Sequence, residues 1–420
     1  METQQDPSQM TILITATLDT KGNEAVFLRE RIESQGCKTL LMNTGIFSIP
    51  SEASQEFNPD ISREEVAIAG GVPIEELLDS KDKGRCIQTM MVGAGKIAAA
   101  LHKEGKFQGV IGIGGAQGTD IGTAAMRALP FGLPKFMVAT VASGLATFGP
   151  YVGTKDIIMM HSVADIQGLN FLTIRVLENA AAAICGMVKA SSSRKNAEMS
   201  KIPVAMSMLG TTTPGALRAK KILEEAGYES VAFHQNGTGG IAMEEMINEG
   251  YFKGVLDLNM HELADSVVGG LHRSIRDFRL ESAGKQGIPQ VIAPGSVNYS
   301  VQGPFDTLAE SLKKQKYIIH NPNLTLVRLT REELIEVAKL AAKKINMATG
   351  PVHVFIPLQG FSFPDREGLP HWEPESNRIF IETLRENLKS SVPFESVDAH
   401  INDDAFTDHV VEKFMSLLST

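Results

Sequence analysis

Short apolar runs alternate with helix-periodic stretches along most of the chain. This alternation is typical of α/β proteins with a mostly parallel sheet, because a helix must return the chain before the next parallel strand can begin. The first half predicts strands over residues 11–16, 38–43, 109–113, 135–140 and 157–160. It predicts helices over residues 23–35, 85–104 and 170–189. Small polar residues without an apolar period follow, which indicates a linker over 191–201.

The second half repeats the order of the first, beginning with a strand at 202–208. Five strand-and-loop segments correspond: 12–22 with 204–215, 40–45 with 231–240, 109–120 with 254–265, 134–144 with 289–299, and 156–162 with 316–322. Five matches in one order predict two related Rossmann-like lobes, 1–190 and 202–420, each α/β with a mostly parallel sheet. Ligands of such sheets bind beyond the carboxyl ends of the strands, so two facing lobes predict a ligand cleft between them. The last part of the chain predicts helices at 331–346, 376–389 and 404–418 and a strand at 352–356.

Composition narrows the class of protein. The 420 residues are 43% hydrophobic and 21% charged, which excludes a disordered or fibrous chain. The net charge of −9 disfavours a nucleic-acid partner, because phosphate backbones require a concentrated basic surface. No signal-peptide pattern and no apolar run of about 20 residues is evident. Three cysteines without a CxxC pair fit a reducing compartment, so we expect a cytoplasmic protein that does not engage membranes.

A glycine-rich segment connects a predicted strand to a predicted helix at residues 112–120. Glycines allow close backbone approach to a phosphate, and a helix start offers free N–H groups to it. The alternative is a tight strand-to-helix turn that only packs. A dinucleotide GxGxxG pattern fails, and a Walker A pattern around Gly93 fails because Ile97 replaces its hydroxyl residue. The candidate phosphate-binding residues are Gly114, Gly115, Ala116, Gln117, Gly118 and Thr119.

A second set of candidate nucleotide-binding residues follows the first two strands. Lys21 can neutralise a phosphate, and Asp19 can hold Mg²⁺ directly or through water. Capping of the next helix by Asp19 or Thr20 is an equal alternative. The full set is Asp19, Thr20, Lys21, Gly22 and Thr44.

The matching loops of the second lobe contain hydroxyls and glycines but no cation. They suit a neutral or anionic small molecule, although Pro214 at a helix start is also ordinary structure. The candidate substrate-binding residues are Thr211, Thr212, Thr213, Asn236, Gly237, Thr238 and Gly239.

In the second lobe, the segment 254–265 that matches the glycine-rich segment contains titratable side chains in place of the glycines. His261 and Asp257 are the candidate catalytic residues, because a histidine near a carboxylate can perform acid–base chemistry. Structural histidines are the competing interpretation. The segment His261–Asp265 is not HExxH, and no other spacing specifies a metal site. Ser296 lies in no GxSxG elbow, so nucleophilic hydrolysis is unsupported.

Several ordered motifs together resemble one known family: TATLDTKGNE, GIGGAQGTDIGTAAM, TVASG, YVGTKDIIMMHSVADIQGLN, LGTTTPG, FHQNGTGGIAME and PLQGFS. The chain resembles, over residues 11–418, an uncharacterised family that includes the ATP-binding N-terminal region of a tomato mosaic virus resistance protein. The resemblance implies two Rossmann-like lobes, ATP and Mg²⁺ as ligands, and a tendency to form homodimers. Asn298 stands where the family usually has Asp, and the loop after Asp365 departs at His371-Trp372-Glu373.

Together these features predict a Mg-ATP-binding, two-lobed protein, with an ATP-dependent reaction on an unknown small molecule in the cleft. One alternative is an ATP-stabilised module that binds another protein without turnover. Another is a nucleotide-sugar enzyme of the glycosyltransferase or epimerase type. The sequence does not decide whether the protein is an enzyme.

Overall fold

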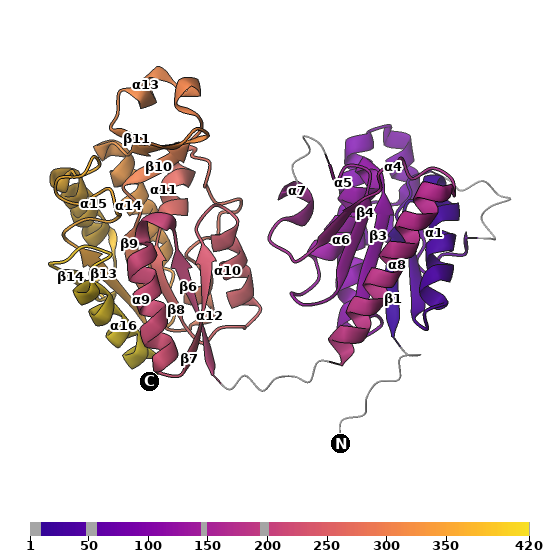
Figure 1. Cartoon of the computed structure of the whole chain (residues 1–420), viewed down its shortest axis with the longest axis horizontal. Coiled ribbons are helices and arrows are strands. Elements are labelled where there is room, and N and C mark those ends of the chain that lie inside the picture. Colours follow the sequence, from indigo (N-terminus) through magenta and orange to yellow (C-terminus); the bar gives the residue numbers. More distant parts are fainter. Residues whose placement is uncertain (1–9, 48–56, 144–148, 194–200, 420) are drawn as a thin grey trace. The chain divides into compact units, whose positions relative to one another are not determined.

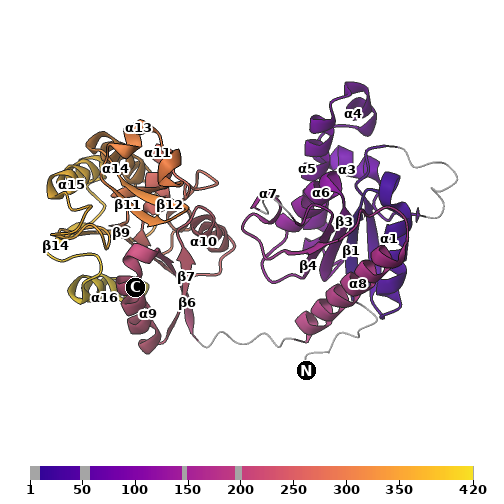
Figure 2. The same ribbon diagram turned by 45° about the horizontal axis from the view of Figure 1, so that its top comes forward.

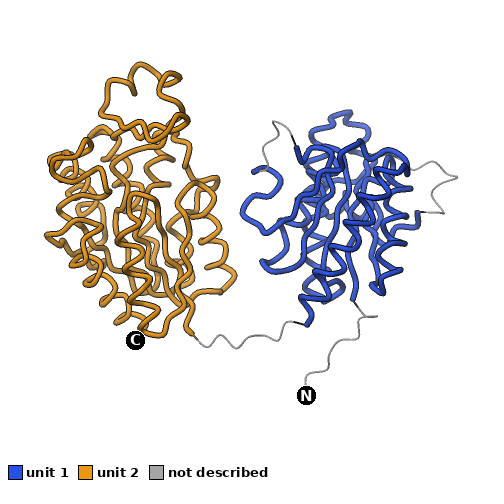
Figure 3. The backbone as a smooth tube through the Cα atoms, in the orientation of Figure 1, with its two compact units in different colours: residues 1–197 blue, residues 198–420 orange. Residues whose placement is uncertain are grey.

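The computed structural model describes residues 10–47, 57–143, 149–193 and 201–419. The chain divides into two compact units, Met1–Ala197 and Glu198–Thr420 (Figure 3). Each unit has its own parallel sheet and its own hydrophobic core. The prediction of two Rossmann-like α/β lobes is confirmed.

Unit 1 is built on a five-stranded parallel sheet with the order β2-β1-β3-β4-β5. The chain adds β2 on one side of β1 and then continues with β3 on the other side. The carboxyl ends of β1 and β3 therefore form a topological switch point, the usual ligand position in an open α/β sheet. The strands are β1 (Thr11–Ala16), β2 (Lys38–Asn43), β3 (Gly109–Gly114), β4 (Lys135–Ala139) and β5 (Ile158–His161).

Helices cover both faces of this sheet (Figures 1 and 2). Alternate residues of β1 face opposite sides: Ile12 and Ile14 join one core, whereas Leu13 joins the other. The first core is closed by α1 (Leu18–Glu33) and α8 (Phe171–Ser192). The second is closed by α3 (Arg63–Gly70), α4 (Ile74–Ser80), α5 (Lys83–Lys103) and α6 (Ala116–Arg127), and a short α7 (Gly149–Val152) precedes β5.

The prediction that no segment is long and apolar enough to cross a membrane is wrong by the criterion of length and composition alone. By length and composition α8 meets that criterion. One face of α8 packs in the core of unit 1, through Leu177, Ala181, Ile184 and Val188. The helix is therefore a partly buried core helix and not a clear membrane span.

Unit 2 is built on a six-stranded parallel sheet with the order β14-β13-β9-β8-β6-β7. Its strands are β6 (Ile202–Met208), β7 (Tyr228–His234), β8 (Val255–Asn259), β9 (Gln290–Gly295), β13 (Val352–Pro357) and β14 (Phe394–Val397). A separate antiparallel sheet, β10-β12-β11, lies at one end of the unit, near the α13 label in Figure 1. It consists of β10 (Tyr299–Gln302), β11 (Tyr317–Asn321) and β12 (Leu324–Arg328), with α13 (Glu310–Lys313) before β11.

The helices of unit 2 also form two layers (Figure 2). One layer contains α9 (Thr213–Glu225) and α16 (Asp404–Leu418), which bury Leu223 and Phe414. The other contains α10 (Gly239–Asn248), α11 (His261–Val268), α12 (Ser282–Gln286), α14 (Arg331–Ile345) and α15 (Pro374–Asn387).

The internal repeat is correct for four of its five strand pairs. The order β2-β1-β3-β4 in unit 1 matches β7-β6-β8-β9 in unit 2. The fifth pair is wrong, because 316–322 forms β11 of the antiparallel sheet, whereas β13 occupies the place beside β9 that β5 has beside β4. A short apolar run does not distinguish a central strand from a hairpin strand.

Two predicted boundaries shift. Helix α1 begins at Leu18 instead of residue 23, and α8 continues to Ser192, so the predicted linker begins inside a helix. Residues 194–200 of that linker, and Gly144 of the TVASG motif, lie outside the described residues.

The Walker A-like stretch at Gly93 lies in the middle of α5, which confirms that it is not a phosphate-binding loop. A Cβ at Gly93 would lie 1.8 Å from the carbonyl oxygen of Val66 in α3. This glycine therefore permits two helices to cross closely. By contrast, a Cβ at Gly186 in α8 has no atom within 4 Å.

We predict that Gly93→Ala lowers the free energy of unfolding by about 3 kcal/mol, because the helix backbones must separate. The matched control Gly186→Ala should raise it by up to about 1 kcal/mol through helix propensity. Urea unfolding of the full-length variants, followed by circular dichroism, measures both. Equal stability of the two variants would contradict the close crossing of α3 and α5.

Candidate functional site

The predicted phosphate loop of unit 1 lies at the carboxyl end of β3, where α6 begins. Gly115 is the N-cap of α6, and no side chain caps the helix there. A Cβ at Gly114 would lie 2.6 Å from the Cα of Gly118, so the turn itself requires Gly114. Among the described residues, a Cβ at Gly115 would meet only Thr140 Oγ1, at 3.8 Å, so packing within that part of the chain does not require this glycine. The first turn of α6 thus combines uncapped N–H groups with a glycine that has room beside it.

The remaining residues of the predicted loop differ in exposure. Ala116 is exposed and Gln117 is half-buried, so both can reach a ligand. Thr119 is buried, and its N–H donates to the carbonyl of Gly115 at 2.8 Å. Thr119 therefore stabilises the helix start from inside.

The start of α1 lies beside the start of α6. A Cβ at Gly118 would lie 3.8 Å from Thr17 Oγ1, which places the loops after β1 and β3 together at the switch point. Thr17 is the N-cap of α1 and makes no side-chain capping bond, so neither Asp19 nor Thr20 caps the helix. Lys21 is half-buried and departs from helical geometry, with φ −130° and ψ 24°.

Three of the predicted nucleotide-binding residues, Asp19, Gly22 and Thr44, contact other parts of unit 1 or are buried in it. Asp19 Oδ2 accepts the N–H groups of Ile46 and Phe47 at 3.1 and 3.0 Å, which holds the loop after β2. A Cβ at Gly22 would lie 2.1 Å from the Phe57 ring, so Gly22 is required for packing. Thr44 is buried and its Oγ1 has no hydrogen-bond partner. The other Asp19 oxygen, Oδ1, accepts a long hydrogen bond of 3.4 Å from Thr20 Oγ1. The predicted Mg²⁺ role of Asp19 stays a prediction.

A pocket of about 270 Å³ opens beside the first turn of α6. Gln117 lines it together with an apolar group from the loop after β2 and from α4 and α5: Ile46, Phe47, Leu77, Leu78 and Cys86. Lys81 and Lys83 line the same pocket and are exposed. The pocket thus combines apolar walls, two cations and a helix start.

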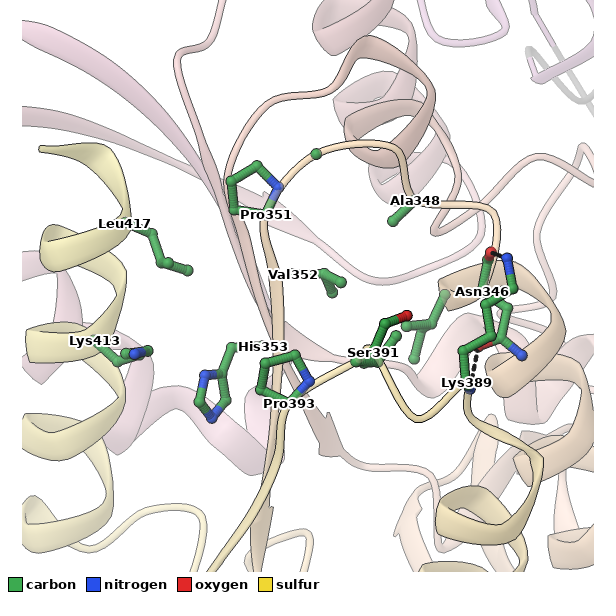
Figure 4. A pocket seen from close by; sticks show the side chains of 13 residues that line it. Asn346, Ala348, Pro351, Val352, His353, Lys389, Ser391, Pro393, Lys413 and Leu417 are labelled. Atoms are coloured by element: carbon green, nitrogen blue, oxygen red, sulfur yellow. Dashed lines mark hydrogen bonds between the residues drawn. The ribbon is translucent and has the colours of Figure 1, made fainter. Parts of the chain in front are cut away.

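Another hollow, of about 420 Å³, lies in unit 2 at the amino ends of β13 and β14 (Figure 4). Pro351, Val352 and His353 border it from β13, and Pro393 and Lys413 border it from the start of β14 and from α16. Ligands of parallel sheets bind at the carboxyl ends of strands. This position therefore does not favour the hollow as the functional site.

At the opposite edge of unit 2, a buried arginine joins three carboxylates. Arg279 donates to both oxygens of Asp257 at 2.6 and 2.7 Å, and also to Glu244 at 3.1 Å and Glu262 at 3.2 Å. All four side chains are at most 2% exposed. Burial lowers the pKa of Arg279, but the three carboxylates outweigh it and raise the pKa overall, so the guanidinium stays charged.

The carboxylates of this cluster also bind helix starts. Glu262 accepts the N–H groups of Gly237 and Gly240 at 2.6 and 3.1 Å, at the start of α10. Glu244 accepts the N–H of Ser282, at the start of α12, at 2.7 Å. The cluster therefore holds β8, α10, α11 and α12 together. Both Asp257 oxygens accept from Arg279, so this carboxylate has a structural role, and its predicted catalytic role stays a prediction.

The predicted substrate-binding loop 236–239 also forms hydrogen bonds at the start of α10. Asn236 Oδ1 accepts from Thr238 Oγ1 at 3.1 Å and from the N–H of Gly239 at 3.2 Å, so it caps α10. Gly237 has a left-handed φ of 95°, and a Cβ at Gly239 would lie 1.9 Å from the His234 carbonyl oxygen. Substrate binding by these residues stays a prediction.

The predicted threonines join a hydrogen-bonded network after β6, β8 and β9. Thr211 Oγ1 lies 2.8 Å from both Ser296 Oγ and Tyr299 Oη. Asn259 Nδ2 donates to Ser296 Oγ at 2.9 Å and to Thr212 Oγ1 at 3.1 Å. Thr213 Oγ1 donates only to the Leu209 carbonyl at 3.2 Å.

Ser296 occupies a strained position in this network. Its φ is 58°, although it is not glycine, and its N–H donates to the Phe361 carbonyl at 2.7 Å. Such strain persists only where surrounding contacts enforce it, and it is concentrated at functional sites. The carbonyl of Ser296 in turn lies 3.1 Å from His261 Nδ1.

His261 is fully buried, and its Nε2 has no hydrogen-bond partner. That atom lies 3.5 Å from Asp265 Oδ2. Burial lowers the pKa of His261, but the Asp265 carboxylate outweighs it, and the net pKa is raised. The His272 ring lies 5.4 Å from the His261 ring, and burial together with His261 lowers the pKa of His272 to about 4. The structure thus brings His261, Asp265 and His272 together.

A second group of buried polar atoms lies next to this network. It includes Asn298, where the chain differs from the family that its motifs resemble. Both side-chain polar atoms of Asn298 are buried without a hydrogen-bond partner, and so is Asp365 Oδ1. Burial raises the pKa of Asp365 to about 6, against the opposing effect of Arg328. The His371 ring lies 5.9 Å from Tyr299. Several unsatisfied buried groups in one region indicate a place for a ligand, water or ion.

Comparison with known proteins shows which family the chain belongs to. The N-terminal and C-terminal domain models of the Uncharacterised protein family (UPF0261) match residues 10–193 and 201–418. The chain belongs to this family. The resemblance found in the sequence motifs is therefore confirmed.

Relatives span almost the whole UPF0261 chain. A UPF0261 protein of Clostridium tetani is 41% identical, with 97% of this chain and 98% of that protein covered. The ToMV resistance protein Tm-1(GCR237) of Solanum lycopersicum is 32% identical, with 97% of this chain but only 55% of that protein covered. A solved UDP-N-acetylglucosamine 2-epimerase of Rickettsia bellii is 12% identical, covers 67% of this chain and 78% of its own, and superposes with a TM-score of 0.25. At that TM-score the likeness supports no conclusion about ligand or activity.

Sequence reasoning on this UPF0261 chain did not single out Asn259, His272, Arg279 or Tyr299. For His272 a signal existed: His261 and Asp265 are four residues apart on one helix, and two glycines follow that helix before His272. For Arg279 none existed, because its partners come from separate helices and a strand.

We predict that Arg279→Met destabilises unit 2 by roughly 3–5 kcal/mol at pH 8, because three buried carboxylates lose their cation. Burial already raises the pKa of Glu262, and Arg279 opposes that rise, so removing Arg279 raises the pKa of Glu262 further. A carboxyl with a raised folded pKa stabilises the fold at low pH and loses that contribution as the pH rises through the folded value. The deficit should therefore be smaller at pH 5 than at pH 8.

Urea unfolding of the full-length chain at both pH values measures this effect. Arg218→Met is the matched control, because Arg218 binds Asp404 and Asp408 on the surface. It should change the stability little at either pH. A small, pH-independent effect of Arg279→Met would show that the buried cluster is not a structural constraint.

Proposed function

We propose that this UPF0261 protein binds Mg-ATP on unit 1 and uses it in a reaction on a small molecule bound at the carboxyl edge of unit 2. The supporting observation is the pocket beside the uncapped start of α6, with Gln117 in its wall. Nucleotide-binding α/β sheets place phosphates at such a helix start beside a topological switch point.

The pocket has the chemistry that the two parts of a nucleotide require. Its apolar walls, including Leu77 and Leu78, suit a nucleobase, and a volume of about 270 Å³ takes the nucleoside part of ATP. Lys81 and Lys83 supply positive charge for phosphates at the pocket, and the α6 start supplies N–H donors. Lys21 follows Thr17 at the same switch point.

Unit 2 supplies the polar groups for a second molecule. Asn298 and Asp365 are buried with unsatisfied atoms, and Ser296 is strained nearby. These groups suit a small molecule with several hydrogen-bonding groups, because its donors and acceptors would satisfy them. That the nucleotide and this molecule meet in a cleft between the units, and that the protein forms homodimers in the cytoplasm, stay predictions.

Two alternatives keep the nucleotide but change its use. A module that binds another protein would bind ATP without consuming it. A nucleotide-sugar enzyme would prefer a nucleoside diphosphate sugar over ATP in the same pocket. Ligand preference and turnover distinguish the three.

We predict that Gly115→Val weakens Mg-ATP binding at least tenfold (about 1.4 kcal/mol). The added side chain blocks approach to the α6 start, whereas the space around Gly115 accepts it without strain. Lys21→Ala should also weaken binding, through loss of one positive charge. Titration calorimetry with Mg-ATP, together with urea unfolding, measures affinity and stability for each variant.

Gly186→Val is the matched control, because that glycine lies on α8 with no atom within 4 Å of its Cβ position. It should bind Mg-ATP like the parent chain. Unchanged affinity in Gly115→Val would refute the phosphate site at α6. Tighter binding of a UDP-sugar than of Mg-ATP would favour the nucleotide-sugar alternative, and ATP binding without any product release would favour the protein-binding module.

A further inference from the structure

Three metal-ligating side chains converge beside β8 in unit 2. His261, Asp265 and His272 each offer one ligand atom, and these atoms lie within 4.8 Å of one another. Two of them, His261 Nε2 and Asp265 Oδ2, are 3.5 Å apart. Tetrahedral zinc with bonds of about 2.0–2.1 Å separates its ligand atoms by roughly 3.4 Å, so small side-chain rotations complete the geometry.

The free nitrogens of both imidazoles support this interpretation. His261 Nε2 and His272 Nδ1 are buried and have no hydrogen-bond partner. A buried polar atom without a partner is uncommon, and two on neighbouring imidazoles, each with a ligand nitrogen within 4.8 Å of the Asp265 carboxylate, have a shared explanation in a bound cation. A hydrogen bond between His261 and Asp265 does not account for them, since 3.5 Å is too long for a good one.

His261 is oriented as a metal ligand would be. Its Nδ1 lies 3.1 Å from the Ser296 carbonyl oxygen, which can only accept a hydrogen bond, so Nδ1 carries the proton. In the neutral imidazole, which is the form that binds a metal, Nε2 then has its lone pair on the side of Asp265. A backbone carbonyl that binds the second nitrogen of a ligating histidine is a regular feature of zinc sites.

The backbone around Asp265 is shaped to bring His272 back to it. Helix α11 ends at Gly269, which adopts a left-handed φ of 74°. A Cβ at Gly270 would lie 2.2–2.4 Å from the Asp265 carboxyl atoms, so only glycine lets the chain pass there. Asp265 Oδ1 accepts the N–H of Val301 at 3.0 Å, and Oδ2 accepts the N–H of His272 at 2.8 Å. These contacts hold the carboxylate between the two histidines.

We propose that His261, Asp265 and His272 bind one zinc ion in unit 2. Two imidazoles and one carboxylate suit zinc and disfavour Mg²⁺, which requires an octahedral set of oxygens. Three protein ligands leave one position for water or for a substrate atom, as in catalytic zinc sites. This inference rests on unit 2 alone and does not depend on nucleotide binding by unit 1. It makes His261 a metal ligand.

The test uses the full-length chain without a histidine tag, stripped with a chelator and titrated with ZnCl₂ against a chromophoric competitor. We expect one zinc per chain, and a rise in melting temperature on adding zinc, since a ligand bound only by the native state stabilises it. His272→Gln should lower zinc affinity more than about 100-fold, because loss of a direct ligand exceeds the 10–100-fold effect of outer partners.

His272→Gln is the least disruptive variant, because His272 is only half-buried and its free ring nitrogen makes no hydrogen bond. Its melting temperature without zinc should equal that of the parent chain. The matched control is His320→Gln, which removes an exposed histidine of β11 in the same unit and should bind zinc normally.

Three outcomes would overturn the proposal. The first is that the parent chain binds less than one zinc ion per chain. The second is that His272→Gln binds zinc as tightly as the parent chain. The third is that His320→Gln loses as much zinc affinity as His272→Gln. Magnesium titrated in place of zinc should produce no stabilisation through this site. Mg-ATP binding, measured separately on the same variants, reports on unit 1, so failure of the zinc site and failure of the nucleotide site are distinguishable.

Discussion

Arg279 is the constraint on which the functional edge of unit 2 depends. Its guanidinium binds carboxylates from β8, α10 and α11, and each group is buried. One guanidinium faces three carboxylates, and backbone N–H groups at the starts of α10 and α12 supply further donors to Glu262 and Glu244. The position of each element is therefore tied to the others. Because Glu262 directly follows His261, the same cluster holds the start of α11, where His261 faces Asp265. A single buried charge thus holds the helix start at which His261 lies beside Asp265.

The two units use the same edge of a parallel sheet in different ways. In unit 1 the loop after β3 is rich in glycine, and α6 begins there with uncapped N–H groups at Gly115. In unit 2 β8 ends at Asn259 and α11 begins at His261, and polar atoms of both residues bind Ser296. The first arrangement favours an anion approached by backbone, and the second favours a ligand approached by side chains. The same strand order therefore presents backbone N–H groups at this edge in unit 1 and polar side chains in unit 2.

Sequence reasoning did not predict the internal contacts of its candidate site residues. Gly114 and Gly22 were predicted to contact a nucleotide, but the first permits the turn and the second permits packing against Phe57. Asp257 was predicted to be catalytic, and both its oxygens bind Arg279. A glycine or a carboxylate after a strand indicates a position under a structural or functional constraint. It does not reveal which neighbours surround that position, because those neighbours come from distant parts of the chain.

The sequence by itself determined the two α/β lobes, most strand positions and the carboxyl edges where polar residues gather. These features follow from local patterns, since strand burial and helix periodicity involve residues close together in the chain. Only the tertiary structure placed β13 and not β11 beside β9, paired Arg279 with its carboxylates, and turned His272 back toward His261. Each of these depends on contacts between separate elements. Their energies come from burial and charge compensation in three dimensions, which no short stretch of sequence encodes.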